Sequence, residues 1–266
     1  ARTLYVSGGA TDAVYSYEWH PERAQPAVLA DSIELGRQDS AATGSRYATG
    51  IALSTNGRAL YVAENLSDSI AVIDLASHRV MQRVGSGPYP YGIAVAPDGY
   101  VYVSAWGASF VNVYRATANG RLAADRPIDV ARHPSTILLN ADGSRLYAVS
   151  ASTDRVAIVN TRARHLIRLL DDPPPDGVVE GSTPDALALS ADESRLYVAE
   201  ADANSVAVFD LSAAASGRAT ARGADTLSGR IPAEWYPTAL VTAGDSVLVV
   251  NGKGRGEFTN PGGPQP

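Results

Sequence analysis

One phrase occurs twice in the chain, and this repeat constrains the fold more than any other feature of the sequence. LYVAENLSDSIAVIDL at residues 60–75 returns as LYVAEADANSVAVFDL at residues 196–211. Weaker versions begin at Leu4, Val101 and Leu146, and a partial version begins at Val247. The copies recur at intervals of 41 to 56 residues, close to the period of roughly 40 to 50 residues of four-stranded repeat units. The spacing predicts six copies of one small sheet.

A second recurring line precedes each phrase and has the pattern of strand, tight turn, strand. Examples are TGIALSTNG, YGIAVAPDG and STILLNADG. Their pairs Asn56-Gly57, Asp98-Gly99 and Asp142-Gly143 are expected to supply the positive φ angles of short hairpins. The apolar runs are nearly continuous, which is typical of sheets covered on both faces. We therefore predict an all-β protein, a β-propeller of four-stranded blades in which each sheet covers the next.

The predicted units lie near residues 1–46, 47–88, 89–132, 133–180, 181–235 and 236–251, and residues 252–266 are predicted to be a Gly- and Pro-rich linker or tail. The first unit lacks its innermost strand and the sixth lacks its outer strands, which leaves four complete units. Because an open arc exposes a blade face and strand edges, a propeller has to close. We therefore expect an incomplete seven-bladed ring. A five-bladed ring, closed by pairing of residues 236–250 with residues 4–17, is the alternative.

Composition excludes several classes of function. The net charge is -6 and no cluster of Lys and Arg occurs, which argues against nucleic acid as a partner. The chain has no cysteine, so it has no disulfide, thiolate metal site or Cys nucleophile. No apolar run is long enough for a membrane span, and the GxSxG pattern of serine hydrolases is absent. We assign no catalytic residue and expect a small ligand or a protein as partner.

A short polar residue stands seven positions after each repeated aromatic residue. These residues are Asp12, Asp68, Ser109, Asp154 and Asn204. Their side chains bond well to backbone N–H groups in turns, so we expect them to hold the connection into the next strand. They are not counted as a charged site.

Another repeat position, three residues after the aromatic one, varies between units. It holds Gly8, Glu64, Ala105, Ser150, Glu200 and Asn251. A position governed by the scaffold alone should be uniform, so Glu64 and Glu200 are candidates for binding a divalent cation such as calcium at the channel mouth. The alternative is that both are solvated carboxylates at strand ends.

The loops that lead into the innermost strands are predicted to gather at one face, where ligands bind. His133 is a candidate acid, base or ligand there. Trp106, Tyr47, Tyr91 and Tyr236 are candidates for stacking a ligand, although such residues often serve packing. Two charged stretches are interpreted as structural and not as ligand sites. The acidic residues Asp171, Asp172, Asp176 and Glu180 are expected to form an exposed loop. The basic pair Lys253 and Arg255 is expected to lie in a hinge.

The residues LYVAEN.SDSIAVIDL and GIAVAPDG resemble the YVTN-type repeat of surface-layer and YncE-like seven-bladed β-propellers. The two ends, TLYVSGGATDAVYSYEW and WYPTALV with LVVNGKGRGEFTNPGGPQP, resemble the propeller that precedes a phosphoesterase domain in bifunctional proteins of the alkaline phosphatase superfamily. The resemblance implies a periplasmic or secreted location and a following catalytic domain beyond Pro266. No residue of this chain inherits that catalytic role.

Three hypotheses for function follow. The leading one is a non-catalytic binding or scaffolding domain of a larger secreted protein. Its expected partners are a following phosphoesterase domain or a second chain that completes the ring. The first alternative is a lactonase-like propeller hydrolase that uses a metal at the channel mouth, held by Glu64, Glu200, Asn251 and His133. The second is a surface adhesion or protein-interaction module, which requires a large exposed apolar patch.

Overall fold

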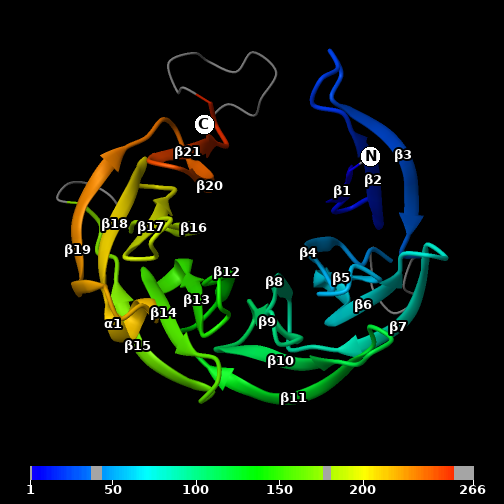
Figure 1. The fold of residues 1–266 in the computed structure, drawn as a ribbon, viewed down its shortest axis with the longest axis horizontal. Helices are drawn as coiled ribbons and strands as arrows, with labels where there is room; N and C mark the ends of the chain where they lie inside the picture. Colours follow the sequence, from blue (N-terminus) through cyan, green and yellow to red (C-terminus); the bar gives the residue numbers. More distant parts are fainter. Residues whose placement is uncertain (1, 37–43, 176–180, 255–266) are drawn as a thin grey trace. The chain divides into compact units, whose positions relative to one another are not determined.

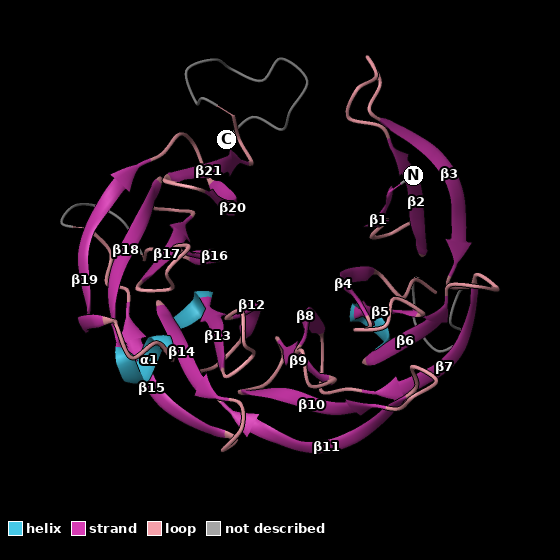
Figure 2. Cartoon of the chain, viewed as in Figure 1, coloured by secondary structure: helices cyan, strands magenta, loops and turns pink. Residues whose placement is uncertain are grey.

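The computed structural model describes residues 2–36, 44–175 and 181–254, and the regular secondary structure of these residues is almost entirely β-strand (Figures 1 and 2). They form four four-stranded sheets, one three-stranded sheet and one two-stranded sheet. The strand pairs of these sheets are antiparallel and consecutive in the chain. The predicted all-β class and the four complete repeat units are therefore confirmed.

The chain divides into two compact units, residues 1–137 and 138–266. The first unit contains β1 (Arg2–Ser7), β2 (Ala13–Trp19) and β3 (Ala27–Glu34), then a sheet of β4 (Ala48–Leu53), β5 (Ala59–Glu64), β6 (Ser69–Asp74) and β7 (Arg79–Gly85). The next sheet comprises β8 (Pro90–Val95), β9 (Tyr100–Ala105), β10 (Phe110–Ala116) and β11 (Leu122–Asp129). Each sheet lies inside one of the predicted repeat units.

The division of the chain falls within β12 (Pro134–Leu139), which forms a sheet with β13 (Arg145–Ser150), β14 (Arg155–Asn160) and β15 (His165–Asp171). The second unit continues with β16 (Pro184–Leu189), β17 (Arg195–Glu200), β18 (Ser205–Ser212) and β19 (Arg222–Pro232), with the short helix α1 (Ala213–Ser216) between the last two. The two-stranded sheet of β20 (Pro237–Ala243) and β21 (Ser246–Asn251) ends the described chain.

The tight turns between first and second strands take their positive φ angles from the predicted pairs. Only the glycine of each pair has a positive φ, for example 66° at Gly57 and 87° at Gly99. The residue before it acts through its side chain instead, since Asn56 Oδ1 accepts the backbone N–H of Arg58 at 3.1 Å. The predicted pairs therefore do supply positive φ, and one left-handed residue with one side-chain bond suffices for this turn.

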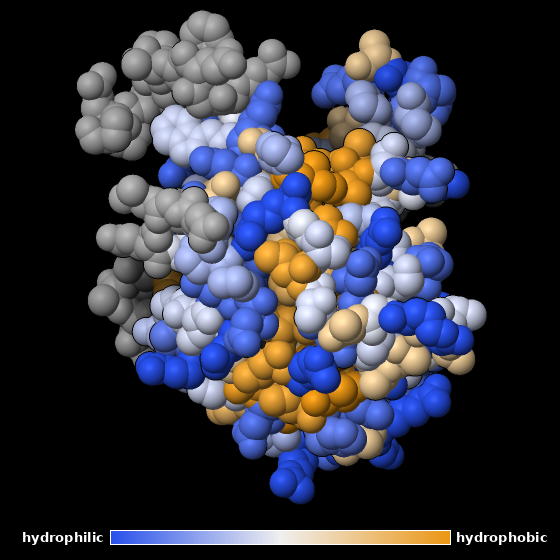
Figure 3. Space-filling view, turned by 90° about the vertical axis from the view of Figure 1, so that its left-hand side faces the viewer, coloured by the Kyte–Doolittle hydropathy of each residue, from blue (hydrophilic) through white to orange (hydrophobic). Residues whose placement is uncertain are grey.

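In the four complete sheets the second strands are mostly buried, as their apolar sequences predict. All six residues of β5 are buried, and the side chains of β13 are buried from Leu146 onwards. Polar side chains cover much of the face drawn in Figure 3, with apolar surface between them. Among the described helices, none is long and apolar enough to cross a membrane.

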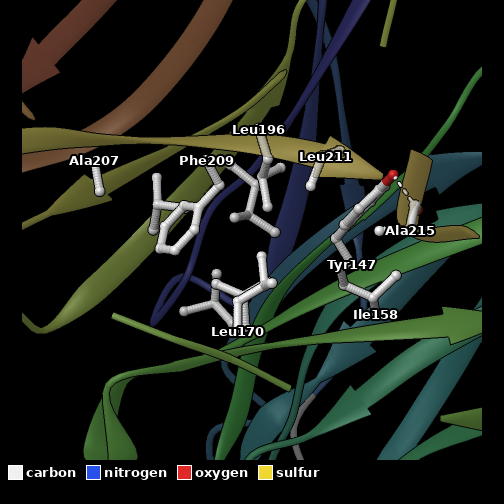
Figure 4. Packing of buried hydrophobic residues seen from close by; sticks show 12 residues of the cluster. Tyr147, Ile158, Leu170, Leu196, Ala207, Phe209, Leu211 and Ala215 are labelled. Carbon is white, nitrogen blue, oxygen red and sulfur yellow. Dashed lines mark hydrogen bonds between the residues drawn. The ribbon is translucent and has the colours of Figure 1, made fainter. Parts of the chain in front are cut away.

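Each hydrophobic cluster joins two consecutive sheets. In the second unit, Tyr147, Ile158 and Leu170 of one sheet pack against Leu196 and Phe209 of the next (Figure 4). Two similar clusters in the first unit join the sheet β1–β3 to β4–β7, and β4–β7 to β8–β11. Because consecutive sheets within each unit cover each other's apolar faces, the same sequence has to recur, which explains the repeated phrase.

The repeated tyrosine also ties one sheet to the next through its hydroxyl group. Tyr147 Oη donates to the backbone oxygen of Ala215 at 2.9 Å, and Tyr61 Oη donates to that of Gly120 at 3.0 Å. Both acceptors lie in the outer connection, between the third and fourth strands, of the following sheet. Burial raises the pKa of both phenols, so they remain donors at neutral pH.

Candidate functional site

The residue directly before the first strand of each later sheet has a left-handed backbone. These residues are Tyr47 (φ 55°), Tyr89 (φ 53°), His133 (φ 55°), Thr183 (φ 50°) and Tyr236 (φ 63°). Residues other than glycine rarely adopt this conformation, and it persists only where the surroundings enforce it. Its repetition indicates that the loops leading into the innermost strands share one built geometry.

Side chains of the predicted turn residues enforce that geometry. Asp68 Oδ1 accepts the backbone N–H of Tyr89 at 2.9 Å, and Asp154 Oδ1 accepts that of Thr183 at 3.0 Å. We call this contact the clasp. It confirms that these side chains bond to backbone N–H groups, but the bonded amide lies 21 or 29 residues further along the chain. The clasp therefore joins one sheet to the first strand of the next.

The clasp recurs with Asp12 and Asn204, which accept the backbone N–H groups of Tyr47 and Tyr236 at 2.9 and 2.8 Å. At the equivalent position in the third sheet stands Ser109. There the backbone oxygen of Ala108 accepts the N–H of His133 at 2.9 Å instead. A backbone acceptor thus takes over where the side chain is shorter.

Three aromatic rings meet at these loops in the first unit. The rings of Trp106 and His133 are stacked, with centroids 5.0 Å apart and an interplanar angle of 21°. Tyr89 meets Trp106 edge to face at 6.1 Å and 77°. Trp106 is 45% exposed and Tyr89 is 44% exposed. We call these three residues the aromatic cluster. It presents flat apolar faces and one imidazole to solvent, which suits a ring-shaped ligand.

Backbone contacts fix the aromatic cluster in place. The N–H of Trp106, directly after β9, donates to the backbone oxygen of Tyr89 at 3.0 Å, and the N–H of Gly107 donates to that of Pro88 at 3.0 Å. A side chain at Gly107 would place its Cβ 2.8 Å from the Tyr89 ring. The close approach of the two loops therefore requires glycine at this position.

The other predicted aromatic residues are Tyr47, Tyr91 and Tyr236. Tyr47 is 43% exposed and Tyr91, on β8, is 40% exposed. In the second unit, Lys253 Nζ lies 4.1 Å from the centroid of the Tyr236 ring and 5.4 Å from that of Trp235. A cation over two ring faces is a favourable contact. The partner of Lys253 in the predicted basic pair, Arg255, lies outside the described residues.

Glu64 is fully buried at the end of β5 and is held by groups of its own sheet. Arg83 Nε donates to both of its carboxylate oxygens, at 3.1 and 3.0 Å, and Ser69 Oγ donates to Oε2 at 2.6 Å. Arg46 Nη1 lies 3.7 Å from Oε2. The interpretation of Glu64 as a solvated carboxylate is therefore wrong, because two cations and a hydroxyl replace water around it.

Glu200, at the end of β17, has the same environment in the second unit. It is fully buried, accepts from Arg230 Nε at 2.8 and 2.9 Å, and accepts from the Ser205 hydroxyl. Arg230 also donates to the backbone oxygen of Pro173. Two sheets thus carry the same buried Glu–Arg–Ser group, and the solvated interpretation is wrong for Glu200 as well.

A second buried carboxyl group, that of Asp172, lies beside Glu200. Asp172 is fully buried, its Oδ2 accepts from Ser182 Oγ at 3.2 Å, and Arg230 Nη2 lies 3.9 Å from its Oδ1. Burial, followed by the charge of Glu200, raises the pKa of Asp172 to about 8. The interpretation of this residue as part of an exposed acidic loop is wrong, and Asp176 and Glu180 lie outside the described residues.

Asn251 occupies the repeat position of these two glutamates in the last sheet. Its Oδ1 is buried and has no hydrogen-bond partner among the described residues. Glu64 and His133 belong to the first unit and Glu200 and Asn251 to the second. Convergence of these four residues therefore stays a prediction.

The residues expected to hold calcium do not fit a cation. The lone pairs of Glu64 and Glu200 already accept from guanidinium and hydroxyl groups, and a guanidinium beside them repels a second positive charge. Within the described ranges, no group of three or more His, Cys, Asp or Glu side chains is placed to hold a metal ion. We therefore derive no chemistry through a metal.

The sequence prediction missed three functional candidates. Tyr89 stands in the same place before a first strand as Tyr47 and His133, and that correspondence was the signal that could have found it. Arg83 and Arg230 lie two residues before the end of fourth strands, and only the strand register shows that they reach a second-strand carboxylate.

Comparison with protein families gives one match, to the SMP-30/gluconolactonase/LRE-like region, over residues 33–152. This segment is less than half of the chain, and it contains the whole aromatic cluster. No curated protein sequence matches the chain.

Solved structures of several proteins resemble the chain. The periplasmic gluconolactonase of Pseudomonas aeruginosa has a TM-score of 0.67 at 19% identity, over 94% of this chain and 70% of that chain. Virginiamycin B lyase from Staphylococcus aureus has a TM-score of 0.67 at 12% identity, over 94% and 74%. Hydrazine synthase of Kuenenia stuttgartiensis has a TM-score of 0.57 at 15% identity, over 94% and 92%. Likeness at such identities concerns the fold alone, and together with the repeated antiparallel sheets it shows that the chain has a β-propeller fold.

Proposed function

We propose that the chain binds a small cyclic ester on the aromatic cluster and hydrolyses it, as a lactonase does. The observation that carries this proposal is the imidazole of His133 stacked on the exposed indole of Trp106. The cluster lies within residues 33–152, the segment similar to the gluconolactonase family. A structural neighbour named as a gluconolactonase also supports this class of substrate.

The cluster offers what such a reaction needs from a binding surface. The faces of Trp106 and Tyr89 pack against the C–H groups of a sugar-like ring. His133 is the general base: its imidazole takes a proton from water as the water oxygen attacks the ester carbonyl. The acyl C–O bond of the ring then breaks, the proton passes to the leaving alkoxide oxygen, and a hydroxy acid results.

A non-catalytic binding domain is the second candidate. It is favoured by the state of Glu64 and Glu200, whose carboxylates are engaged by Arg83 and Arg230 and so do not fit the metal-assisted mechanism. The YVTN-type relationship, the link to a phosphoesterase domain and the periplasmic or secreted location remain predictions from resemblance. The surface adhesion or protein-interaction module also remains a prediction.

Hydrolysis of gluconolactone, followed with a pH indicator against the spontaneous rate, distinguishes the two candidates. The proposal expects saturable catalysis that EDTA leaves unchanged. His133→Gln should lower kcat by about a hundredfold or more, and Trp106→Ala should raise KM by about tenfold. Trp235→Ala is the matched control, because Trp235 is similarly exposed at 41% but lies in the second unit, and its kinetics should match those of the wild type.

Tryptophan fluorescence with the same lactone gives the second measurement. Quenching that depends on Trp106 without any turnover would support the non-catalytic candidate and overturn the lactonase proposal. Neither turnover nor quenching with gluconolactone and a panel of other lactones would overturn both.

A further inference from the structure

The last sheet differs from the four complete sheets because β21 pairs only with β20 among the described residues. In a complete sheet, the second strand pairs on its other edge with a third strand, as β5 pairs with β6 from Glu64↔Ser69 to Ala59↔Asp74. No described strand pairs with the outer backbone N–H and C=O groups of β21, and such an edge is a template for another strand.

The side chain of Asn251 shows what is missing at this edge. At its repeat position, Glu64 accepts from Ser69 on the third strand and from Arg83 on the fourth. Glu200 accepts from Ser205 and Arg230 in the same way. Asn251 Oδ1 is buried and has no hydrogen-bond partner in the described part of the chain. A buried acceptor of this kind is costly unless a donor arrives, and the donors in the other sheets come from the outer two strands.

The preceding sheet, β16–β19, also has groups that the outer strands of a following sheet would cover. Tyr61 and Tyr147 donate to the outer connection of the following sheet, whereas Tyr197 lines an open cavity of about 850 Å³ together with Asp245 and Val247 of the last sheet. Ile231 on β19 is 45% exposed, although its counterpart Val84 on β7 packs into the core shared with the next sheet. The turn of an outer hairpin would fill this cavity beside Tyr197, and its strands would cover Ile231.

The chain after β21 already begins the turn that leads into a third strand. The N–H groups of Gly252 and Lys253 donate to the backbone oxygens of Tyr236 and Trp235, at 2.7 and 3.2 Å. In the complete sheet β4–β7, Asn65 and Leu66 make the same pair of bonds. Residues 255–266, GEFTNPGGPQP after Arg255, have one large apolar residue and three prolines, so they lack the sequence pattern of β6 and β7.

We propose that the outer edge of β21 and the cavity beside it bind an antiparallel β-hairpin of a partner polypeptide. The hairpin completes the last sheet as Ser69–Gly85 completes the sheet β4–β7. Its first strand carries a hydroxyl donor opposite Asn251, its alternate residues are apolar against Ile231, and the carbonyl groups of its turn lie near Tyr197. This inference is independent of the proposed hydrolase activity.

A synthetic peptide of residues 69–85, SIAVIDLASHRVMQRVG, is the probe, and a scrambled peptide of the same composition is its control. The proposal expects saturable binding of the probe alone by isothermal titration calorimetry. Asn251→Leu in the protein and Ser69→Ala in the peptide should each weaken binding by about five- to tenfold, and together by little more than either alone. Tyr61→Phe, a change in a complete sheet, should leave the affinity unchanged.

A fused chain tests the same claim if the free peptide aggregates. In it, residues 69–85 follow Gly254 in place of residues 255–266, and the scrambled segment is again the control. A higher Tm with slower amide exchange along β21 in the first fusion alone supports the proposal. Equal behaviour of both fusions and both peptides would overturn it. A dimer of the original chain that protects the same β21 amides would overturn the assignment to a separate hairpin.

Discussion

Replacing Asp172 with asparagine should remove most of the pH dependence of stability between about pH 4 and pH 8. Burial and the neighbouring Glu200 raise the pKa of Asp172 from 3.8 to about 8 in the folded protein. The folded chain therefore binds a proton that the unfolded chain releases above its ordinary pKa. Stability is then greatest at low pH within this window and falls as the pH rises.

The size of the effect follows from the width of that window. One proton bound only in the folded state changes the free energy of unfolding by about 1.4 kcal/mol per pH unit. The wild type should therefore lose about 3 kcal/mol between pH 5 and pH 7 through this group. Asparagine has the hydrogen-bonding shape of the neutral acid and no proton to release, so the variant should keep its stability.

Urea unfolding followed by circular dichroism at pH 5, 6, 7 and 8 measures the difference. Asp171→Asn is the matched control, because Asp171 is adjacent in sequence, 75% exposed and paired with Arg155 at the surface. It should leave the pH profile of the wild type unchanged. If the free energy of unfolding changes with pH in the same way in the wild type and in Asp172→Asn, the assignment of a buried protonated carboxyl group is refuted.

Two further changes test the contacts between consecutive sheets. Asp68→Ala removes the clasp on the N–H of Tyr89 and should lower the free energy of unfolding by about 1–2 kcal/mol, whereas Ser109→Ala should cost less than about 0.5 kcal/mol because Ala108 supplies the acceptor there. If chemical unfolding shows that Asp68→Ala and Ser109→Ala lower the free energy of unfolding equally, the stabilising role of the clasp is contradicted. Tyr147→Phe leaves the Ala215 carbonyl without its donor and should cost about 1–3 kcal/mol; an unchanged unfolding midpoint would show that this bond contributes nothing.

The repeat units could be predicted because their signal is local and redundant. Tyr61, Tyr102 and Tyr147 mark second strands at a nearly constant period, and the apolar residues beside them indicate burial on both faces. The turn glycines Gly57 and Gly99 add the strand boundaries. These features depend only on neighbouring residues, which is why the predicted units and the observed sheets have nearly the same limits.

The side-chain partners could not be predicted in the same way. Asp68 was expected to bond to a backbone amide, yet the amide it bonds to belongs to Tyr89 in the next sheet. Glu64 was noticed because its position varies, but Arg83 reaches it across the intervening strand β6. Such contacts depend on strand register and on the packing of whole sheets, and the sequence contains no local sign of either.

Asp172 shows why the acidic stretch was misread. Four acidic residues among three prolines have the composition of an exposed loop. However, the N–H of Asp172 donates to the backbone oxygen of Asp154, which continues the edge of β15 and carries the side chain inward beside Glu200. This one backbone hydrogen bond thus decides that Asp172 is buried while its neighbour Asp171 is exposed.

Residue-resolved amide hydrogen exchange tests the central claim, that the chain is a series of four-stranded sheets ending in an incomplete one. The account predicts slow exchange throughout the second and third strands of the complete sheets, such as β5 and β6 or β17 and β18, and fast exchange for the amides of β21 that point away from β20. Fast exchange in β6 or β18, or uniform protection along β21 in the isolated chain, would contradict it.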